Sequence, residues 1–142
     1  MHRDPTRVLQ ASASQATILK SLFRSSVDTQ LVAADQVRSL TEKVDKILSF
    51  RETESHLEEC FIDICYLELA RDPMMTVRSI YDRFGFQLSP EAEDRMKLFI
   101  AAESKGRRPD KYALADFSLD PEKIDPRFDL YCERFGVGRE PL

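Results

Sequence analysis

The 142-residue sequence is poor in residues that bind metals or form disulfides. It contains two histidines, His2 and His56, and three cysteines, Cys60, Cys65 and Cys132. An odd number of cysteines, no Cys-x-x-Cys pair and no secretion signal predict reduced core thiols in a cytoplasmic protein. With so few histidines, we expect no metal site.

The sequence also lacks a long apolar run and an excess of positive charge. No apolar run approaches membrane-spanning length, and the basic, polar N-terminus does not resemble a signal peptide, so we expect no membrane span. The net charge of −4 argues against a general nucleic-acid binder. A composition of 42% hydrophobic and 32% charged residues is typical of a soluble globular protein. The length suffices for one domain with one core.

Two basic islands interrupt this acidic chain. Residues 1–27 carry Arg3, Arg7, Lys20 and Arg24 against Asp4 alone. Residues 104–112 carry four further basic side chains against a single aspartate. The two islands could build a local anion site, but from charge alone a solvated surface is the better interpretation.

The stretch from residue 60 to residue 85 changes its hydrophobic period at the middle. Its first part is a short, nearly continuous apolar run, which predicts one strand at about residues 60–66, buried on both faces in a parallel sheet. Asp72 and Pro73 then provide a capping side chain and a first helical residue. A helix follows up to Phe84, and Gly85 offers a left-handed stop.

Four further helices are predicted from the same signals. They begin at Asp4-Pro5, at about Ala33, at Ser89-Pro90 and at Asp125-Pro126. The expected apolar face of the first helix consists of Val8, Ala11, Ile18, Leu19, Leu22 and Phe23. That of the last helix consists of Phe128, Tyr131, Cys132 and Phe135, and Gly136 is its expected stop. The result is a mostly helical α/β chain with one strand, and that strand needs neighbours because unpaired backbone groups in an apolar site are costly.

Four segments, in this order, resemble the C-terminal half of a bacterial-type sulfotransferase. They are the Met1-His2-Arg3-Asp4-Pro5 start, residues 66–85, residues 89–96 and residues 106–131. Sulfotransferases use 3′-phosphoadenosine 5′-phosphosulfate as the donor and have a P-loop-type α/β fold. The resemblance therefore implies that residues 1–142 form a single, partial sulfotransferase domain.

The resemblance also implies which residues bind the 3′-phosphate of the donor. In the family, the arginine of the Arg-Asp-Pro element and a serine eight residues later hold this phosphate, so Arg3 is the implied ligand. The residue eight positions on is Ala11 rather than serine, and Ser12 beside it is the suggested substitute. The basic loop with Arg107 and Arg108 resembles the C-terminal segment that closes over the phosphate.

Tyr66 resembles the tyrosine that lies against the adenine of the donor. Its ring offers a flat apolar face with a polar tip, which suits a purine. The residue types implied for the 3′-phosphate are also chemically suitable, because guanidinium groups and helix N-termini bind phosphate well. For each of these side chains the alternative is a structural role, as a core aromatic at Tyr66 or as surface arginines elsewhere.

In the family, the phosphosulfate-binding loop and the catalytic base precede the Arg-Asp-Pro element, and the 142 residues contain no Gly-rich loop with Lys, Ser or Thr. We therefore expect a fragment without catalytic residues: a truncated gene product, a pseudogene remnant or the product of a mis-called start. The implied reaction moves a sulfuryl group to a hydroxyl or amine of a small-molecule or glycan acceptor. The alternatives are a non-catalytic helical interaction module derived from that fold and the C-terminal part of a P-loop kinase. Because the fragment leaves apolar helix faces uncovered, we also expect it to self-associate.

Overall fold

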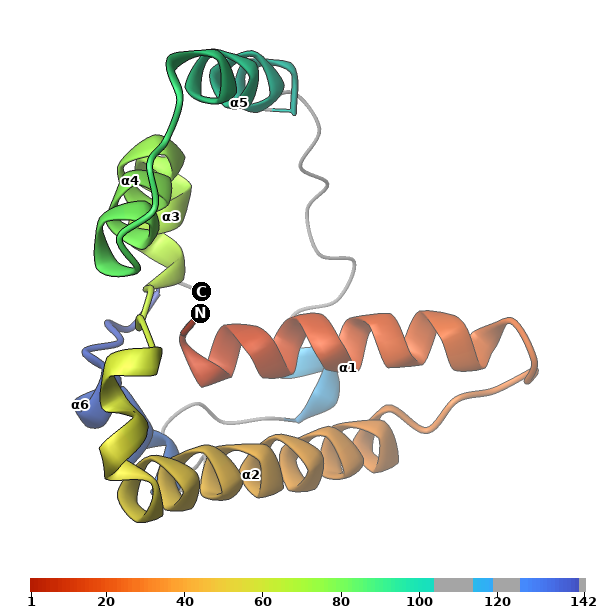
Figure 1. The fold of residues 1–142 in the computed structure, drawn as a ribbon. Helices are drawn as coiled ribbons and strands as arrows, with labels where there is room; N and C mark the ends of the chain where they lie inside the picture. The colour runs from red at the N-terminus through yellow and green to blue at the C-terminus, as the bar shows by residue number, and fades with distance from the viewer. Residues whose placement is uncertain (104–113, 119–125, 141–142) are drawn as a thin grey trace. The chain divides into compact units, whose positions relative to one another are not determined.

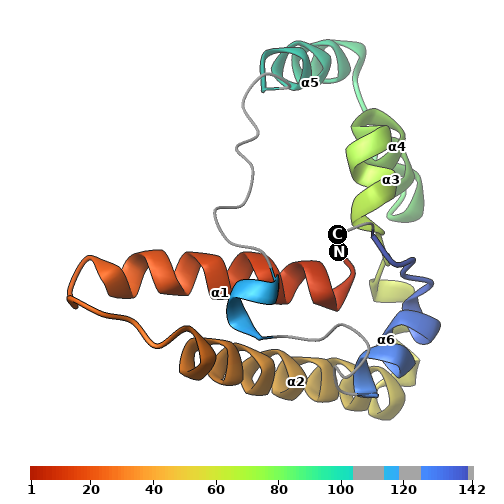
Figure 2. The ribbon, with the colours of Figure 1, turned by 180° about the vertical axis from the view of Figure 1, so that it is seen from behind.

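A computed structural model describes residues 1–103, 114–118 and 126–140. The chain divides into two compact units. One consists of Met1–His2 and Glu59–Pro109, and the other of Arg3–Glu58 and Asp110–Leu142. We call them the α4 unit and the α2 unit, after the helix that contacts the others in each (Figures 1 and 2).

In the α2 unit, three elements contact one long helix. Helix α1 (Pro5–Ser21) packs along α2 (Thr29–Thr53), which also contacts α6 (Arg127–Phe135) and the short 3-10 helix η2 (Leu114–Phe117). Figures 1 and 2 show α1 and α2 side by side. A second 3-10 helix, η1 (Ser55–Cys60), follows α2. No helix among the described residues combines the length and apolar character needed to cross a membrane.

The core of the α2 unit is built around the aromatic face of α6. Of the predicted face, Phe128, Tyr131 and Phe135 are buried and Cys132 is half-buried. Tyr131 and Phe135 contact each other with ring centroids 5.1 Å apart. Leu9 of α1 and Val44 of α2 complete the cluster. Gly136 ends α6 in the left-handed conformation at φ +61°, as expected of a helix stop.

The predicted apolar face of α1 is wrong. The buried face carries Leu9, Ala13 and Thr17, which are four residues apart and therefore share one side of the helix. Ala13 forms a second small cluster with Ala33 of α2 and Phe117 of η2. Small side chains allow α1 and α2 to approach closely, so the larger apolar residues at the end of α1 remain exposed, namely Ile18, Leu19, Leu22 and Phe23.

In the α4 unit, the described residues form three α-helices in sequence. They are α3 (Tyr66–Arg71), α4 (Pro73–Arg83) and α5 (Pro90–Glu103), and α4 contacts both of the others. The start of α4 confirms the sequence prediction, because the Asp72 carboxylate accepts a hydrogen bond from the N–H of Met75 at 2.9 Å. The predicted stop is also confirmed, since Gly85 has φ +67°.

The strand predicted at residues 60–66 is not formed. Cys60 ends η1, Tyr66 begins α3, and the residues between them are half-buried or exposed rather than buried on both faces. Cys65 makes a single parallel bridge to His2, in which the His2 N–H donates to Ile64 O and the Tyr66 N–H donates to His2 O, both at 2.7 Å. A strand needs neighbours along its whole length, and the described residues supply one pairing partner at one position.

The thiols only partly match the sequence prediction. All three cysteines are free, but Cys60 is exposed rather than part of a core, and Cys65 and Cys132 are half-buried. Burial raises the pKa of both half-buried thiols, and the charges of Glu68 and Asp63 raise that of Cys65 further. Among the described residues, no three histidine, cysteine, aspartate or glutamate side chains gather where they could hold a metal ion.

Candidate functional site

Arg3 lies immediately before the N-terminus of α1, where local sequence fixes the backbone. The Asp4 carboxylate accepts hydrogen bonds from the N–H of Thr6 at 2.9 Å and from its hydroxyl at 2.8 Å. Pro5 occupies the first helical position, where no N–H is needed. Asp4 is only 1% exposed, so the cap that sets the direction of Arg3 is itself firmly held.

The guanidinium of Arg3 makes a two-point contact with a carboxylate from the other end of the chain. Its Nε lies 3.0 Å from Oε1 of Glu140, and its Nη2 lies 3.0 Å from Oε2. The side chain of Glu140 is 8% exposed and that of Arg3 is 26% exposed. Such paired contacts are stronger than single hydrogen bonds and also fix the plane of the guanidinium.

Asp4 ties the same C-terminal segment to the start of α1. Its second carboxylate oxygen accepts from the backbone N–H of Glu140 at 2.9 Å, and Arg139 reaches the first oxygen at 3.4 Å. Burial alone would raise the pKa of the Asp4 carboxyl. The hydrogen bonds from Glu140 and Thr6, together with the positive charge of Arg139, outweigh this effect and lower the pKa below its usual value of 3.8.

Ser12, the suggested second phosphate ligand, lies on α1 in the same unit as Arg3. It is seven residues beyond Pro5, which corresponds to about 10 Å along the helix axis. Its hydroxyl donates to the carbonyl of Leu9 at 3.2 Å, so in this conformation it is engaged with its own helix. The neighbouring Ser14 is buried.

Tyr66 belongs to the α4 unit, where it is the first residue of α3 and is half-buried. Its backbone is held by the hydrogen bond to His2 O. His2 is held in turn, since its buried ring places Nε2 2.8 Å from Oδ1 of Asp63. Arg107 and Arg108 lie outside the described residues.

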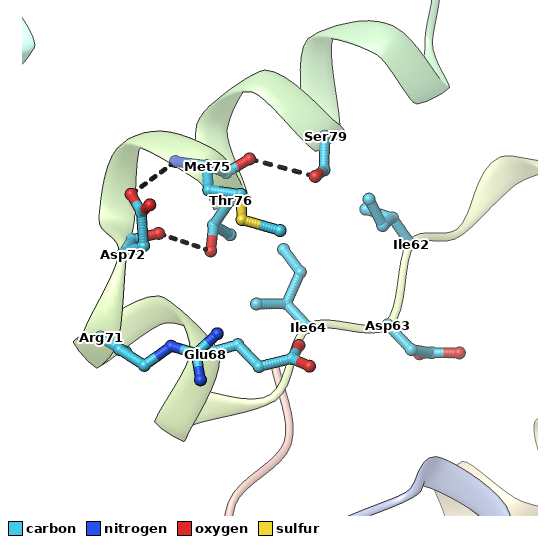
Figure 3. A pocket seen from close by; sticks show the side chains of 9 residues that line it. All are labelled: Ile62, Asp63, Ile64, Glu68, Arg71, Asp72, Met75, Thr76 and Ser79. Atoms are coloured by element: carbon cyan, nitrogen blue, oxygen red, sulfur yellow. Dashed lines mark hydrogen bonds between the residues drawn. The ribbon is translucent and has the colours of Figure 1, made fainter.

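One pocket in the α4 unit contains none of the predicted site residues (Figure 3). It measures about 170 Å³, which is below the several hundred cubic ångströms typical of pockets that hold a drug-sized ligand. Ile62, Ile64 and Met75 point into it, and its other lining residues include the carboxylates of Asp63, Glu68 and Asp72. A pocket of this size, lined by three carboxylates and a single guanidinium, that of Arg71, is poorly suited to a nucleotide that carries phosphates.

Comparison with known proteins decides the family. Residues 1–90 match the sulfotransferase family. The chain belongs to the sulfotransferase family. The crystal structure of sulfotransferase STF9 from Mycobacterium avium is similar to it, with 27% sequence identity and a TM-score of 0.86. The match covers 99% of this chain and 36% of that chain. No curated protein matches.

The chain therefore has a mostly helical, partial sulfotransferase fold and spans about a third (36%) of the solved sulfotransferase. The segment matched by the family contains Arg3, Ser12 and Tyr66, and ends before Arg107, Arg108 and Glu140. The family resemblance drawn from the sequence is thus confirmed, whereas the donor-binding roles of individual residues stay predictions.

Sequence reasoning missed two contacts that organise this sulfotransferase fragment. Glu140 lies near the C-terminus outside any periodic pattern, and its contact with Arg3 spans 137 positions, so no local signal could have identified it. The contact between His2 and Asp63 had one signal in the sequence, because each residue lies within a segment that was singled out for another reason. Pairing the two would have required knowledge of the bridge between His2 and Cys65.

Proposed function

We propose that this chain supplies the 3′-phosphate and adenine side of the donor site of a sulfotransferase. The enzyme would move a sulfuryl group from 3′-phosphoadenosine 5′-phosphosulfate to an acceptor hydroxyl or amine. One observation carries the proposal: a partly exposed, firmly held guanidinium, that of Arg3, at the entrance of a capped helix. Guanidinium groups at helix N-termini combine two of the strongest protein features for binding phosphate.

Each predicted residue has a role in this proposal. Arg3 binds the 3′-phosphate, Ser12 adds a hydroxyl contact after rotating away from Leu9 O, and the ring of Tyr66 lies against adenine. Arg107 and Arg108 close over the phosphate. Catalysis of this kind depends above all on stabilising the charge that develops around sulfur, which requires a phosphosulfate-binding loop that the 142 residues do not contain. Residues 1–142 alone should therefore show no donor turnover.

The first test replaces Arg3 with alanine and compares two nucleotides by titration calorimetry. Binding of adenosine 3′,5′-bisphosphate should weaken by about 1.5–3 kcal/mol, the value of a charge-assisted hydrogen bond. Adenosine 5′-monophosphate, which lacks the 3′-phosphate, should bind as before. The matched control is Arg38→Ala in the same unit, because the Arg38 side chain is 72% exposed and pairs with Asp35 of its own helix, α2. An equal loss for both nucleotides would show that Arg3 does not recognise the 3′-phosphate.

The second test replaces Tyr66 with alanine. Both nucleotides carry adenine, so both should lose affinity by a similar factor, and a loss confined to one of them would contradict the role of Tyr66. ATP serves as a further ligand in the same titrations. Preference for ATP would favour the kinase alternative, and binding of no nucleotide at all would favour the interaction module.

The interaction module has one observation in its favour, the exposed apolar side chains near the connection between α1 and α2. Leu22 is 70% exposed, Phe23 86% and Leu31 66%. Exposed apolar patches mark protein-interaction sites or lead to association. If a second copy of the chain covers this surface, sedimentation velocity will show an oligomer that Phe23→Glu converts to a monomer.

A further inference from the structure

Both residues of the Arg3–Asp4 element are bound by the same short segment. The carboxylate of Glu140 binds the guanidinium of Arg3, and the backbone N–H of the same residue donates to Asp4. Arg139 adds a contact to Asp4 at 3.4 Å and one to Asp129 at 2.6 Å. The segment is therefore tied both to the cap of α1 and to α6.

This arrangement fixes the orientation of Arg3 relative to α1. An arginine side chain loses rotamer entropy when it is ordered. A carboxylate that already holds Nε and Nη2 removes most of that loss before any ligand arrives. Because Asp4 holds the backbone of Glu140, the plane of the guanidinium is set by the same cap that starts the helix.

We propose that Glu140 is a positioning residue for the donor site, which holds the guanidinium of Arg3 in the orientation that receives the 3′-phosphate. The inference rests on the proposed function, since it gives Glu140 a role only through Arg3. Glu140 itself contacts no nucleotide. It orients Arg3 in the way that second-layer hydrogen bonds keep the ligands of a binding site in place.

The contact itself can be tested without nucleotide. In a proton–nitrogen correlation spectrum, the Nε–H of Arg3, assigned by its loss in Arg3→Ala, should exchange slowly with water. Glu140→Ala should abolish this protection. Glu140→Gln keeps one acceptor oxygen and the backbone N–H, so it should give an intermediate rate. Fast exchange of this proton in the unaltered protein would overturn the inference.

A double-mutant cycle tests the positioning role. Glu140→Ala should weaken adenosine 3′,5′-bisphosphate binding on the order of tenfold, the equivalent of about one charge-assisted contact, and leave adenosine 5′-monophosphate binding unchanged. Glu140→Gln should restore part of the loss. In the Arg3→Ala background, Glu140→Ala should have no further effect, because interacting residues are not additive. The matched control is Glu91→Gln, which alters an exposed carboxylate that pairs with Arg95 one turn along the same helix.

The other outcomes show whether the positioning role of Glu140 fails or the proposed function itself fails. Equal loss of both nucleotides in Glu140→Ala would mean a merely structural role. Tighter binding of the bisphosphate would mean that the carboxylate competes with the phosphate for Arg3, and unchanged binding would mean that Arg3 needs no support. These three outcomes overturn the positioning role and leave that of Arg3 intact. Failure of the proposed function appears instead as unchanged 3′-phosphate selectivity in Arg3→Ala alone.

Discussion

The α2 unit and the α4 unit both contain capped α-helices, but they bury very different numbers of apolar side chains. In the α2 unit, Phe117, Phe128 and Leu9 are 2% exposed or less. In the part of the α4 unit that the structure describes, the most deeply buried apolar side chain is that of Met74, at 9% exposed. Burial of apolar surface is the main driving force of folding, so the two units differ in what holds them together.

The difference shows that helix capping and the burial of apolar side chains contribute separately to stability. Both units have an Asp-Pro helix start, at Asp4 and at Asp72, and both have a left-handed glycine stop. Caps contribute about 1 kcal/mol each, which defines where a helix begins without creating a core. The α4 unit also has surface ion pairs, such as those of Glu93 with Arg78 and with Lys97, but exposed pairs contribute little to stability.

The largest expected effect comes from the aromatic core of the α2 unit. Phe128→Ala should lower the free energy of unfolding by about 3–5 kcal/mol, because it removes a buried ring and leaves a cavity. Chemical denaturation followed by circular dichroism measures this loss. The matched control is Leu130→Ala on the same helix, where the side chain is 58% exposed and the loss should stay below about 1 kcal/mol. Similar losses for the two variants would contradict the core assignment.

This core could be predicted in part, because the apolar face of α6 repeats at helical spacing. The helix starts at Asp4 and Asp72 were predictable for a related reason, since a cap is a contact between residues two or three positions apart. Gly85 and Gly136 were predictable as stops because glycine adopts positive φ with little strain. Signals of this kind depend on residues that are near each other in the sequence, so they do not depend on the contacts made by the rest of the chain.

The features that could not be predicted depend on contacts between distant residues. The run from Phe61 to Tyr66 has strand composition, but among the described residues it forms a β-bridge at one position only, between Cys65 and His2. The buried face of α1 was hidden because Ala13 and Thr17 are small, and their burial depends on the close approach of α2. The pairing of Arg3 with Glu140, which dominates the candidate site, carries no periodicity at all.

A second prediction concerns Asp4, which caps α1 in the α2 unit and also binds the backbone of Glu140, the partner of Arg3. The folded-state pKa of Asp4 is lowered from 3.8, so its contribution to stability is present above that value and is lost as the pH falls through the lower, folded-state pKa. The free energy of unfolding of the unaltered protein should therefore fall as the pH drops toward and below 3.8. Asp4→Asn keeps a good cap but removes the charge, so its acid dependence should be shallower.

At pH 7, Asp4→Asn should lower the free energy of unfolding by about 1.5–3 kcal/mol, because hydrogen bonds to a buried carboxylate are lost. Urea titrations at several pH values measure both effects. The matched control is Asp94→Asn in the α4 unit, whose side chain is 74% exposed and should cost less than about 0.5 kcal/mol at pH 7. An Asp4→Asn variant with the acid dependence of the unaltered protein would show that Asp4 is not the group responsible.

The smallest expected effect is also the sharpest test of the comparison, because matched glycines lie in both units. Gly85 in the α4 unit and Gly136 in the α2 unit have φ values of +67° and +61°, and an added Cβ would meet no atom within 4 Å at either site. Alanine at each position should therefore cost only backbone strain, about 1–2 kcal/mol. Gly138 also has open space around it, without a positive φ, so Gly138→Ala should be neutral or slightly stabilising.

Amide hydrogen exchange, measured helix by helix, then shows whether the units unfold together. If the sparsely buried α4 unit opens by itself, Gly85→Ala should speed exchange in α3, α4 and α5 and leave α2 and α6 unchanged. Gly136→Ala should lower the protection of α2 and α6, which exchange through the opening of the aromatic core. Equal acceleration of all five helices by both variants would mean one cooperative transition, and the difference in burial would then not divide the chain into separately unfolding parts.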